Sequence, residues 1–329
     1  MLFLTSRDVA ALVTMTDVVE ALEAGYAAHG RGEVADVPRE NLRPPTGDGS
    51  LKAMPAAGPQ GLGGILYTGG FRGRPEGTVS KLTVLFDGEH GDLACVIESD
   101  RLSWLRTGAT SGVATDHLAR DDVSRLGLVG SGRQARSQLL GVAAVRDLDE
   151  VVVYSPTRAN RERFAAEMAD RVDADVRPVS SARAAVEGSD VVCTATTSPE
   201  PVLDGEWLAP GTHVNAIGAH YPDQREVDEE TVRRCRVVVD ALDRARKEEG
   251  ELIIPAGTGA FDWDDAVELG AVVAGDVPGR EDEDETTLMT SGGLSMEYLV
   301  TGRLVYDRAV EAGVGTELLG DAAPGTGRT

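Results

Sequence analysis

A glycine-rich turn in the middle of the chain constrains its fold more than any other feature. In "RLGLVGSGRQARSQLL", a short apolar strand is followed by Gly130, Gly132 and Ala135 in G-x-G-x-x-A spacing, and then by a helix. The first glycine permits a tight turn, the second lets backbone approach a pyrophosphate, and the small third residue lets helix and strand pack closely. A second strand, "EVVVYS", completes a βαβ unit. The pattern predicts a dinucleotide site at the turn and the helix start, comprising Gly130, Ser131, Gly132, Arg133 and Gln134.

The alternation of strands and helices continues beyond this unit. The helices "RANRERFAAEMADRV" and "ARAAVEGS" and the strands "VRPVSS", "DVVCTATT", "THVNAIGA" and "CRVVVD" follow. Such alternation predicts a doubly wound parallel sheet, so the expected fold class is α/β of the Rossmann type. The ends of two later strands, "TATT" and "AIGA", are where the nicotinamide half of a dinucleotide would run. They add five residues to the predicted cofactor site: Thr194, Ala195, Thr196, Ile217 and Gly218.

The flanking segments have a different pattern. Residues 1–30 are predicted to form a helix capped by Thr16 or Asp17, followed by loops and the strands "GGILYTG", "TVSKLTVLFD" and "GDLACVIE" in a mainly antiparallel region. "LSWLRTGATSGVATDHLA" has the spacing of a buried helix, and "SMEYLVTGRLVYDRAVEAG" returns to helix near the end. We therefore expect an α+β domain over residues 1–115, completed by 290–329, and a Rossmann domain over 116–289.

The end of the second strand bears on the choice of cofactor. A carboxylate there would hold the ribose 2′-hydroxyl of NAD. The chain instead reads "VVVYSPTRANRER", which offers Ser155, Thr157 and Arg158. Hydroxyls and a guanidinium suit a 2′-phosphate, so the sequence predicts a preference for NADP(H), with NAD(H) also accepted. The alternative is that Arg158 only begins the next helix.

Composition excludes several classes of function. The chain has 55 acidic and 32 basic residues, and its net charge of −23 repels a phosphate backbone, so nucleic-acid binding is not expected. Arginine almost replaces lysine, which together with the acidity suggests a halophilic source. No basic segment precedes a long apolar stretch, so we expect a cytoplasmic protein without membrane contact. The three cysteines and five histidines lack ligand spacing, so no metal is predicted.

The order of motifs resembles the ornithine cyclodeaminase and mu-crystallin family over nearly the whole chain. The shared segments are "VPRENLRPP", "AMPA", "LSWLRTGATSGVATDHLAR", "GLVGSGRQA", "VVCTATTSPEPVLDGEWLAPGTHVNAIGAHYPDQREVD" and "VVVDALDRARKEEGEL". The resemblance implies a substrate-binding and dimerisation domain beside a Rossmann domain, and hence a homodimer. It also implies hydride transfer between a nicotinamide and the α-carbon of a small amino or imino acid.

The resemblance assigns roles to individual residues. Arg39 in "VPRE" and Arg106 in "WLRTGA" match arginines that hold the substrate carboxylate, a task that suits a bidentate guanidinium. Thr78 matches a threonine that contacts substrate. Two positions depart from the family: Ile65 lies at or near the place of its catalytic lysine, and His220 replaces the aspartate of the ornithine-deaminating enzymes. His220 either donates a proton to an imine nitrogen or is a structural histidine.

Lys81 is one of only three lysines, and it lies inside a predicted strand. Strand alternation puts Lys81 and Thr78 on opposite faces. Lys81 therefore replaces the missing family lysine only if a bulge redirects it toward the substrate.

Three functions are consistent with these residues. The leading hypothesis is an NAD(P)H-dependent oxidoreductase, either a ketimine or pyrroline-carboxylate reductase or an alanine-type dehydrogenase. The first alternative is an ornithine cyclodeaminase, which forms proline and ammonia. The second is a non-catalytic homologue that binds NADP(H).

Overall fold

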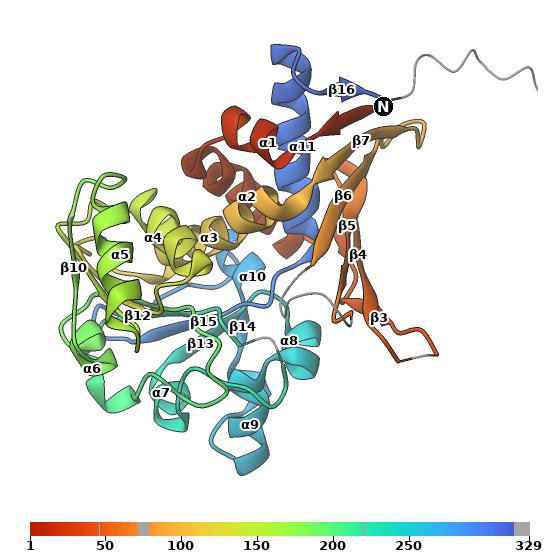
Figure 1. Cartoon of the computed structure of the whole chain (residues 1–329). Helices are drawn as coiled ribbons and strands as arrows, with labels where there is room; N and C mark the ends of the chain where they lie inside the picture. The colour runs from red at the N-terminus through yellow and green to blue at the C-terminus, as the bar shows by residue number, and fades with distance from the viewer. Residues whose placement is uncertain (46, 72–78, 220, 319–329) are drawn as a thin grey trace, which may run out of the picture. The chain divides into compact units, whose positions relative to one another are not determined.

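The chain folds into two compact units, which can be followed in Figure 1. The computed structural model describes residues 1–45, 47–71, 79–219 and 221–318. The first unit comprises Met1–Thr14, Val34–Ser103 and Ser295–Thr329, and the second comprises Met15–Glu33 and Trp104–Leu294. Helix α3, Ser99–Leu118, begins in the first unit and continues into the second.

The first unit is built on a mixed sheet in the order β16-β1-β7-β6-β5-β4-β2, with β3 paired to β4. Strands β4 to β7 pair antiparallel, as predicted, whereas β1 pairs parallel with β7. The elements of this unit are β1 Leu2–Leu4, α1 Ser6–Leu12, β2 Ala35–Asp36, β3 Glu40–Leu42, β4 Ser50–Gly58, β5 Gly61–Gly69, β6 Ser80–Phe86, β7 Leu93–Glu98, α11 Ser295–Ala312 and β16 Thr316–Glu317.

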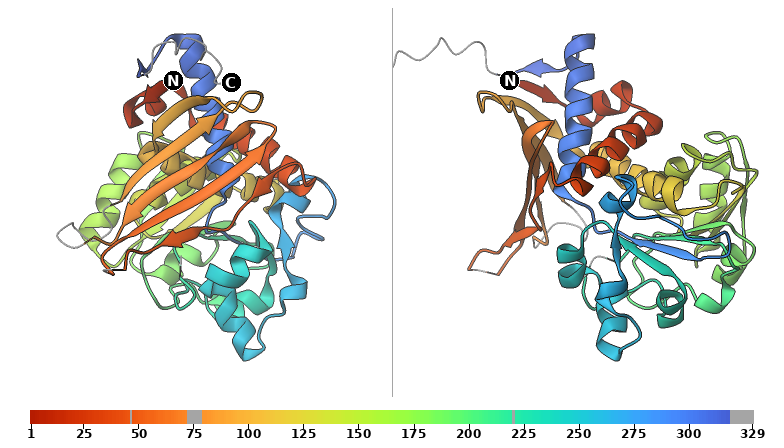
Figure 2. Two further views of the ribbon diagram at one scale, coloured as in Figure 1. Left: turned by 90° about the vertical axis from the view of Figure 1, so that its right-hand side faces the viewer. Right: turned by 180° about the vertical axis from the view of Figure 1, so that it is seen from behind.

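Alternation along the strands gives this sheet an inner and an outer face. Thr83 and Leu85 of β6 are buried on the inner face, against which α11 packs. Figure 2 shows α11 lying along the sheet. Gly302 permits that close approach, because a Cβ there would stand only 3.2 Å from Thr83 Cγ2. Leu82 and Phe86 alternate onto the outer face, where both are exposed.

The second unit is built on an all-parallel sheet in the order β10-β9-β8-β11-β12-β15-β13-β14. The strand order runs outward from β8 in both directions, which is the doubly wound arrangement. The predicted fold class is therefore confirmed. The elements are α2 Met15–Gly30, β8 Arg125–Val129, α4 Arg133–Ala143, β9 Glu150–Tyr154, α5 Arg158–Met168, β10 Asp175–Pro178, α6 Ala182–Val186, β11 Val191–Thr194, η1 Gly205–Trp207, β12 His213–Ala216, α7 Glu229–Arg234, β13 Arg236–Val239, α8 Leu242–Glu248, α9 Gly250–Thr258, η2 Trp263–Asp265, β14 Val267–Glu268, α10 Leu269–Val273 and β15 Thr287–Thr290.

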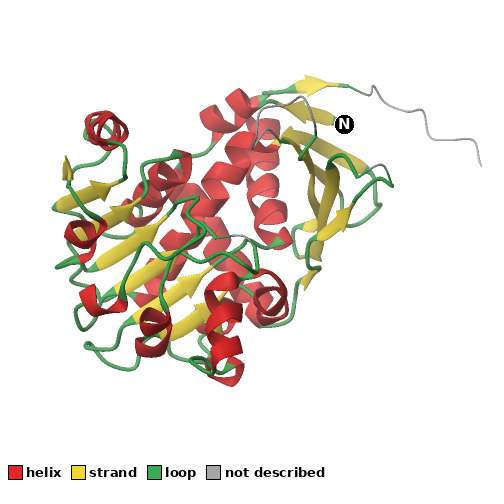
Figure 3. Cartoon of the chain, turned by 60° about the horizontal axis from the view of Figure 1, so that its bottom comes forward, coloured by secondary structure: helices red, strands yellow, loops and turns green. Residues whose placement is uncertain are grey.

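Each face of the parallel sheet has its own apolar core. Along β9, Val151 and Val153 join one core with Phe164 of α5, whereas Val152 joins the other with Val186 of α6. Figure 3 shows helices on both sides of these strands. Because both faces are covered, most residues of β8, β9, β11 and β13 are apolar, and the edges formed by the strand ends remain for polar chemistry.

The amino-terminal segment differs from the predicted single helix over residues 1–30. It contains a strand, β1, and two helices, α1 and α2. Thr5 caps α1 in a capping box with Asp8, and Val13 ends that helix in an extended conformation. The prediction was wrong because apolar periodicity alone does not show this break.

None of the helices in the described ranges combines the length and apolar character needed to cross a bilayer.

Candidate active site

The predicted glycine loop joins the end of β8 to the start of α4. Gly130 has a φ of 121°, and a Cβ there would stand 2.9 Å from the carbonyl carbon of Ala195. Gly132 is the N-cap of α4 without a side-chain cap, and a Cβ on it would meet no atom within 4 Å. The loop thus leaves open space beside the first amides of α4, which attract an anion. These features fit the pyrophosphate of a dinucleotide. Arg133 and Gln134 form the first turn of α4.

The predicted residues at the end of β9 lie close to this loop. Ser131 Oγ donates to Ser155 Oγ at 2.7 Å, which ties the loop to the strand end. Ser155 Oγ is also 3.4 Å from the carbonyl oxygen of Thr157, the N-cap of α5. The Arg158 side chain is 80% exposed and pairs with Glu162 at 2.6 Å. Hydroxyl and guanidinium groups thus gather where the adenosine ribose of a dinucleotide would lie.

The loops after β11 and β12 are held by one buried carboxylate, that of Glu226. Its Oε2 accepts hydrogen bonds from Thr194 Oγ1 and the Gly218 N–H, both at 2.7 Å, and its Oε1 accepts one from the Thr196 N–H at 2.6 Å. A Cβ at Gly218 would stand 2.5 Å from the Glu226 carboxyl carbon, so this position requires glycine. The structure therefore brings the two predicted loop segments, around Ala195 and around Ile217, onto a common anchor.

Glu226 is a residue that the sequence prediction missed. It lies in "PDQREVD", directly after the predicted "AIGA", but the sequence gives no indication of its partners. Its backbone N–H and that of Val227 donate to Glu251 Oε1 and Oε2, at 2.7 and 3.1 Å. Burial raises the pKa of Glu226, against hydrogen bonds that lower it. Burial and the charge of Glu226 raise the pKa of Glu251 to about 8.

Arg106 extends from α3 to the segment that follows β15. A Cβ at Gly293 would stand 2.9 Å from Arg106 Cζ, so the guanidinium lies directly against this glycine. The Gly293 N–H donates to Asp240 Oδ2 at 2.8 Å, and Asp240 directly follows β13. Because β8, β13 and β15 belong to one parallel sheet, Arg106 and the glycine loop lie at its carboxyl edge.

A second guanidinium at this edge is already paired. Arg244 is buried and forms ion pairs with Asp240 and Glu249. Ser291 Oγ donates to Asp240 Oδ2 at 2.9 Å, and Thr290 Oγ1 donates to Glu249. This network fixes the ends of β13 and β15 and neutralises the charge of Arg244.

The other described candidates lie in the first unit. Arg39 is half-buried and directly precedes β3. Lys81 pairs in register with Tyr67, and Thr83 pairs with Ile65. Lys81 and Ile65 therefore share the inner face of the sheet, two residue pairs apart along the strands, with the pair of Leu66 and Leu82 between them. Ile65 is only 1% exposed, and its apolar side chain cannot act as the family lysine would.

The remaining predicted residues, Thr78 and His220, lie outside the described residues. A different histidine, His213, is buried in β12 with Nδ1 2.9 Å from Thr287 Oγ1. Burial lowers the pKa of His213 to about 3, so its ring is neutral and does not serve as an acid near neutral pH.

Three side chains on α2 and α3 are arranged so that they could hold a cation. Candidate ligand atoms of Glu23, Asp116 and His117 lie within 4.8 Å of one another. His117 Nε2 is 3.2 Å from Glu23 Oε1, and Arg146 pairs with Asp116. A guanidinium thus already neutralises part of the group, and the absence of a metal stays a prediction.

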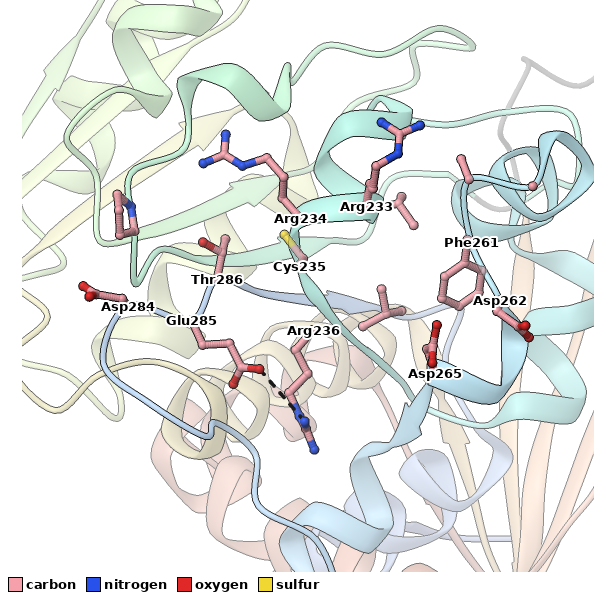
Figure 4. Close-up of a pocket in the computed structure, with 15 residues that line it drawn as sticks. Arg233, Arg234, Cys235, Arg236, Phe261, Asp262, Asp265, Asp284, Glu285 and Thr286 are labelled. Carbon is pink, nitrogen blue, oxygen red and sulfur yellow. Dashed lines mark ion pairs between the residues drawn. The ribbon is translucent and has the colours of Figure 1, made fainter.

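A cavity of about 930 Å³ lies at the opposite, amino edge of the parallel sheet, beside the starts of β13 and β15 (Figure 4). In its lining, Arg236 pairs with Glu281 at 2.9 Å and with Glu285 at 4.0 Å. Burial raises the pKa of the Cys235 thiol to about 12, so the thiol stays protonated. The cavity is therefore separate from the glycine loop and contains no activated nucleophile among these groups.

Known proteins are similar to this chain in both sequence and fold. An alanine dehydrogenase of Archaeoglobus fulgidus is 33% identical over 322 residues, which cover 96% of this chain and 98% of that protein. The structure of the Thermococcus litoralis Delta(1)-pyrroline-2-carboxylate reductase in complex with NADH and L-proline is 36% identical and matches with a TM-score of 0.90, over 97% of this chain and 100% of that one. An archaeal alanine dehydrogenase dimer with bound NAD is 32% identical and matches with a TM-score of 0.88, over 97% and 99%.

The family resemblance seen in the motifs is also confirmed by direct comparison with family sequences. The model of the ornithine cyclodeaminase/mu-crystallin family matches residues 1–313, which include every candidate residue above. With motifs, fold and overall sequence in agreement, this chain belongs to the ornithine cyclodeaminase/mu-crystallin family.

Proposed function

We propose that this protein is an NAD(P)H-dependent oxidoreductase that acts at the α-carbon of a small amino or imino acid, with a cyclic imine carboxylate as the preferred substrate. The reduced nicotinamide would supply a hydride to the imine carbon, and a proton from water or His220 would complete the amine. Arg39 and Arg106 would hold the carboxylate, and Thr78 would contact the substrate.

One observation carries this proposal. The Arg106 guanidinium and the Gly130–Gly132 loop lie at the carboxyl edge of the same parallel sheet. A guanidinium binds a carboxylate in a fixed, bidentate geometry, and the loop suits a dinucleotide. An edge that offers both groups suits hydride transfer to or from a small carboxylic acid.

The relatives support the same class of reaction. The reductase from Thermococcus litoralis was solved with NADH and L-proline, and the relative from Archaeoglobus fulgidus is an alanine dehydrogenase. Both names describe chemistry at the α-carbon of a small amino acid, and they differ in substrate. The choice between a cyclic imine and pyruvate with ammonium is therefore the first question for experiment.

The test is oxidation of NADPH and NADH in the presence of pyrroline-2-carboxylate, piperideine-2-carboxylate, or pyruvate with ammonium. We expect turnover of a cyclic imine. Arg106→Met should lower kcat/KM by roughly 100-fold, because a charge-assisted bidentate contact is lost. Arg106→Lys should recover only part of that loss.

Arg303→Met is the matched control, since Arg303 pairs with Asp307 on α11. It should leave kcat/KM unchanged. If cofactor binds but none of these substrates is reduced, the oxidoreductase assignment fails. Ammonia release from ornithine without net NADH formation would then favour a cyclodeaminase, and no turnover at all would favour a non-catalytic homologue.

We further propose a preference for NADP(H), supported by Ser155, Thr157 and Arg158 at the end of β9. The related structures were solved with NADH or NAD, which supports NAD(H) as an accepted cofactor. A KM for NADH well below that for NADPH would contradict the preference.

A homodimer formed through the sheet of the first unit is part of the proposal, and substrate binding is assigned to a domain over residues 1–115, which contains Arg39, Thr78 and Arg106. The outer face of its sheet exposes large apolar side chains, and one relative was solved as a dimer. We also propose adaptation to high salt, supported by the net charge of −23. A Tm that does not rise between low and molar KCl would contradict that adaptation.

A further inference from the structure

Glu226 connects two loops of the predicted cofactor site through its side chain. It is 0% exposed, and its two carboxylate oxygens accept hydrogen bonds from Thr194, Thr196 and Gly218. Two of the three donors are backbone N–H groups, which fix the path of the chain. The carboxylate therefore joins the loops after β11 and β12 at the point where each leaves the sheet.

The first of these loops also contacts the glycine loop. The Ala195 N–H donates to the carbonyl oxygen of Val129 at 2.9 Å. A Cβ on Gly130 would stand 2.9 Å from the Ala195 carbonyl carbon. A continuous set of contacts thus runs from Glu226 through the Thr194–Thr196 segment to the predicted pyrophosphate site.

The bonding pattern also favours a charged Glu226. Two of the three partners are backbone N–H groups, which can only donate, and the Thr194 hydroxyl can donate as well, so the ionised carboxylate can use all three contacts. Burial opposes ionisation, and the hydrogen bonds oppose the effect of burial. A buried anion at this position would attract a cationic, oxidised nicotinamide more than a neutral, reduced one.

We propose that Glu226 is a positioning residue for the nicotinamide half of the dinucleotide: its carboxylate sets the loops after β11 and β12, and its charge favours the oxidised cofactor. The inference rests on the proposed dinucleotide site. It assigns to Glu226 a role in binding that is separate from substrate recognition by the arginines.

The test compares binding of the whole cofactor with binding of its adenine half. Kd values are measured by titration for NADH, NAD⁺ and ADP, and for NADPH, NADP⁺ and 2′,5′-ADP. In Glu226→Gln, the amide group must face one loop donor with its own NH₂. We expect the Kd of the reduced cofactor to rise about tenfold, the loss of one charged-group hydrogen bond. The Kd of the adenine fragment should stay within about twofold.

The charge assignment is read from the same titrations. Because glutamine is neutral, the oxidised cofactor should lose about threefold more affinity than the reduced one. An unchanged ratio of the two Kd values would overturn the role of the charge. An equal loss for the adenine fragment, or no loss for any ligand, would overturn the positioning role.

Two further variants keep the test decisive. Thr194→Val removes one donor to Glu226 without altering the carboxylate, and should weaken the whole cofactor by about threefold while sparing the fragment. If Glu226→Gln does not fold, Thr194→Val alone tests the positioning role. Asp228→Asn is the control, because Asp228 caps α7 and bonds Gly205 and Thr231 rather than the two loops. If the unmodified protein binds neither fragment nor cofactor, the proposed function fails instead.

Discussion

At the scale of single residues, Ile65 raises the sharpest question, because the family resemblance implies a lysine at or near this position. Lys81 lies diagonally across from Ile65 on the inner face, where side chains are about 7–8 Å apart. Its Nζ is 3.4 Å from Ser103 Oγ, which in turn is 3.1 Å from the Tyr298 hydroxyl. Lys81 is long and flexible, and it lies on the same face of the sheet as Ile65, so it could supply the cation that a lysine at position 65 would provide. No bulge is needed for this.

We therefore predict that Lys81→Met lowers kcat/KM by roughly 100-fold, as expected when a charged contact to substrate is lost. Adding Ile65→Lys to that variant should restore at least about tenfold, since the ammonium returns to the same face. Lys247→Met, in an exposed lysine of α8, is the control. Unchanged kinetics for Lys81→Met in steady-state assays would remove Lys81 from the site.

Arg158 provides a second prediction at this scale. If it binds a 2′-phosphate, Arg158→Ala should raise the KM for NADPH about tenfold and leave the KM for NADH within about twofold, since NADH lacks that phosphate. Arg163→Ala is the matched control on α5, where Arg163 bonds Asn160. Equal effects on both cofactors would show that Arg158 only supports the helix through Glu162.

Gly130 and Glu226 illustrate which site residues can be predicted from the sequence and which cannot. Gly130 could be predicted because its backbone conformation and close packing demand glycine, and such demands follow a short spacing. Glu226 could not, because its partners Thr194 and Thr196 lie 32 and 30 residues away. Contacts at that separation depend on how the loops fold back, which local patterns do not encode.

At the scale of elements, β12 carries a testable pH dependence. His213 is buried and neutral, with a pKa lowered to about 3, whereas in the unfolded chain its pKa is near 6.5. Protons therefore bind the unfolded chain preferentially between these values, and stability falls as pH falls through that window.

The prediction is that the unfolding free energy of the unmodified protein drops about 2 kcal/mol more than that of His213→Gln between about pH 7.5 and about pH 5. Urea titrations at both pH values measure the difference. His90→Gln, at an exposed position, should behave like the unmodified protein. Parallel losses in His213→Gln and the unmodified protein would mean that other groups set the acid limit.

Element boundaries were predictable only where the pattern was local. The alternation that predicts β8, α4 and β9 lies within one continuous stretch, and the structure has all three. Strand β1 is three residues long and is defined by its pairing with β7 and β16. A strand of that length has too few residues to show periodicity, so no local pattern predicts it.

At the scale of the whole molecule, local sequence patterns predict the type of sheet but not its full strand order. Alternating strands and helices predict a doubly wound sheet, but not that β15 lies between β12 and β13. That order brings Gly293 next to Asp240, and so positions Arg106 at the carboxyl edge. The chemistry of the site thus depends on a strand order that only the folded chain shows.

The outer face of the first unit leads to the last prediction. Leu66 pairs with Leu82, and Leu62 pairs with Phe86, so these exposed apolar residues form adjacent rows. An apolar cavity of about 500 Å³ lies among the same strands. Water contact with such a face is unfavourable, and a second copy would cover it.

Leu66→Glu should therefore raise the dimer Kd by roughly 100-fold, because dimerisation would bury an unpaired carboxylate. Sedimentation velocity at several protein concentrations measures the shift, and circular dichroism checks the fold. Val310→Glu, at an exposed apolar position on α11, is the control and should leave the dimer intact. Each copy carries a charge of −23, so added KCl should strengthen association by screening their repulsion. A monomeric unmodified protein at all salt concentrations, or a dimer insensitive to Leu66→Glu, would place the contact elsewhere.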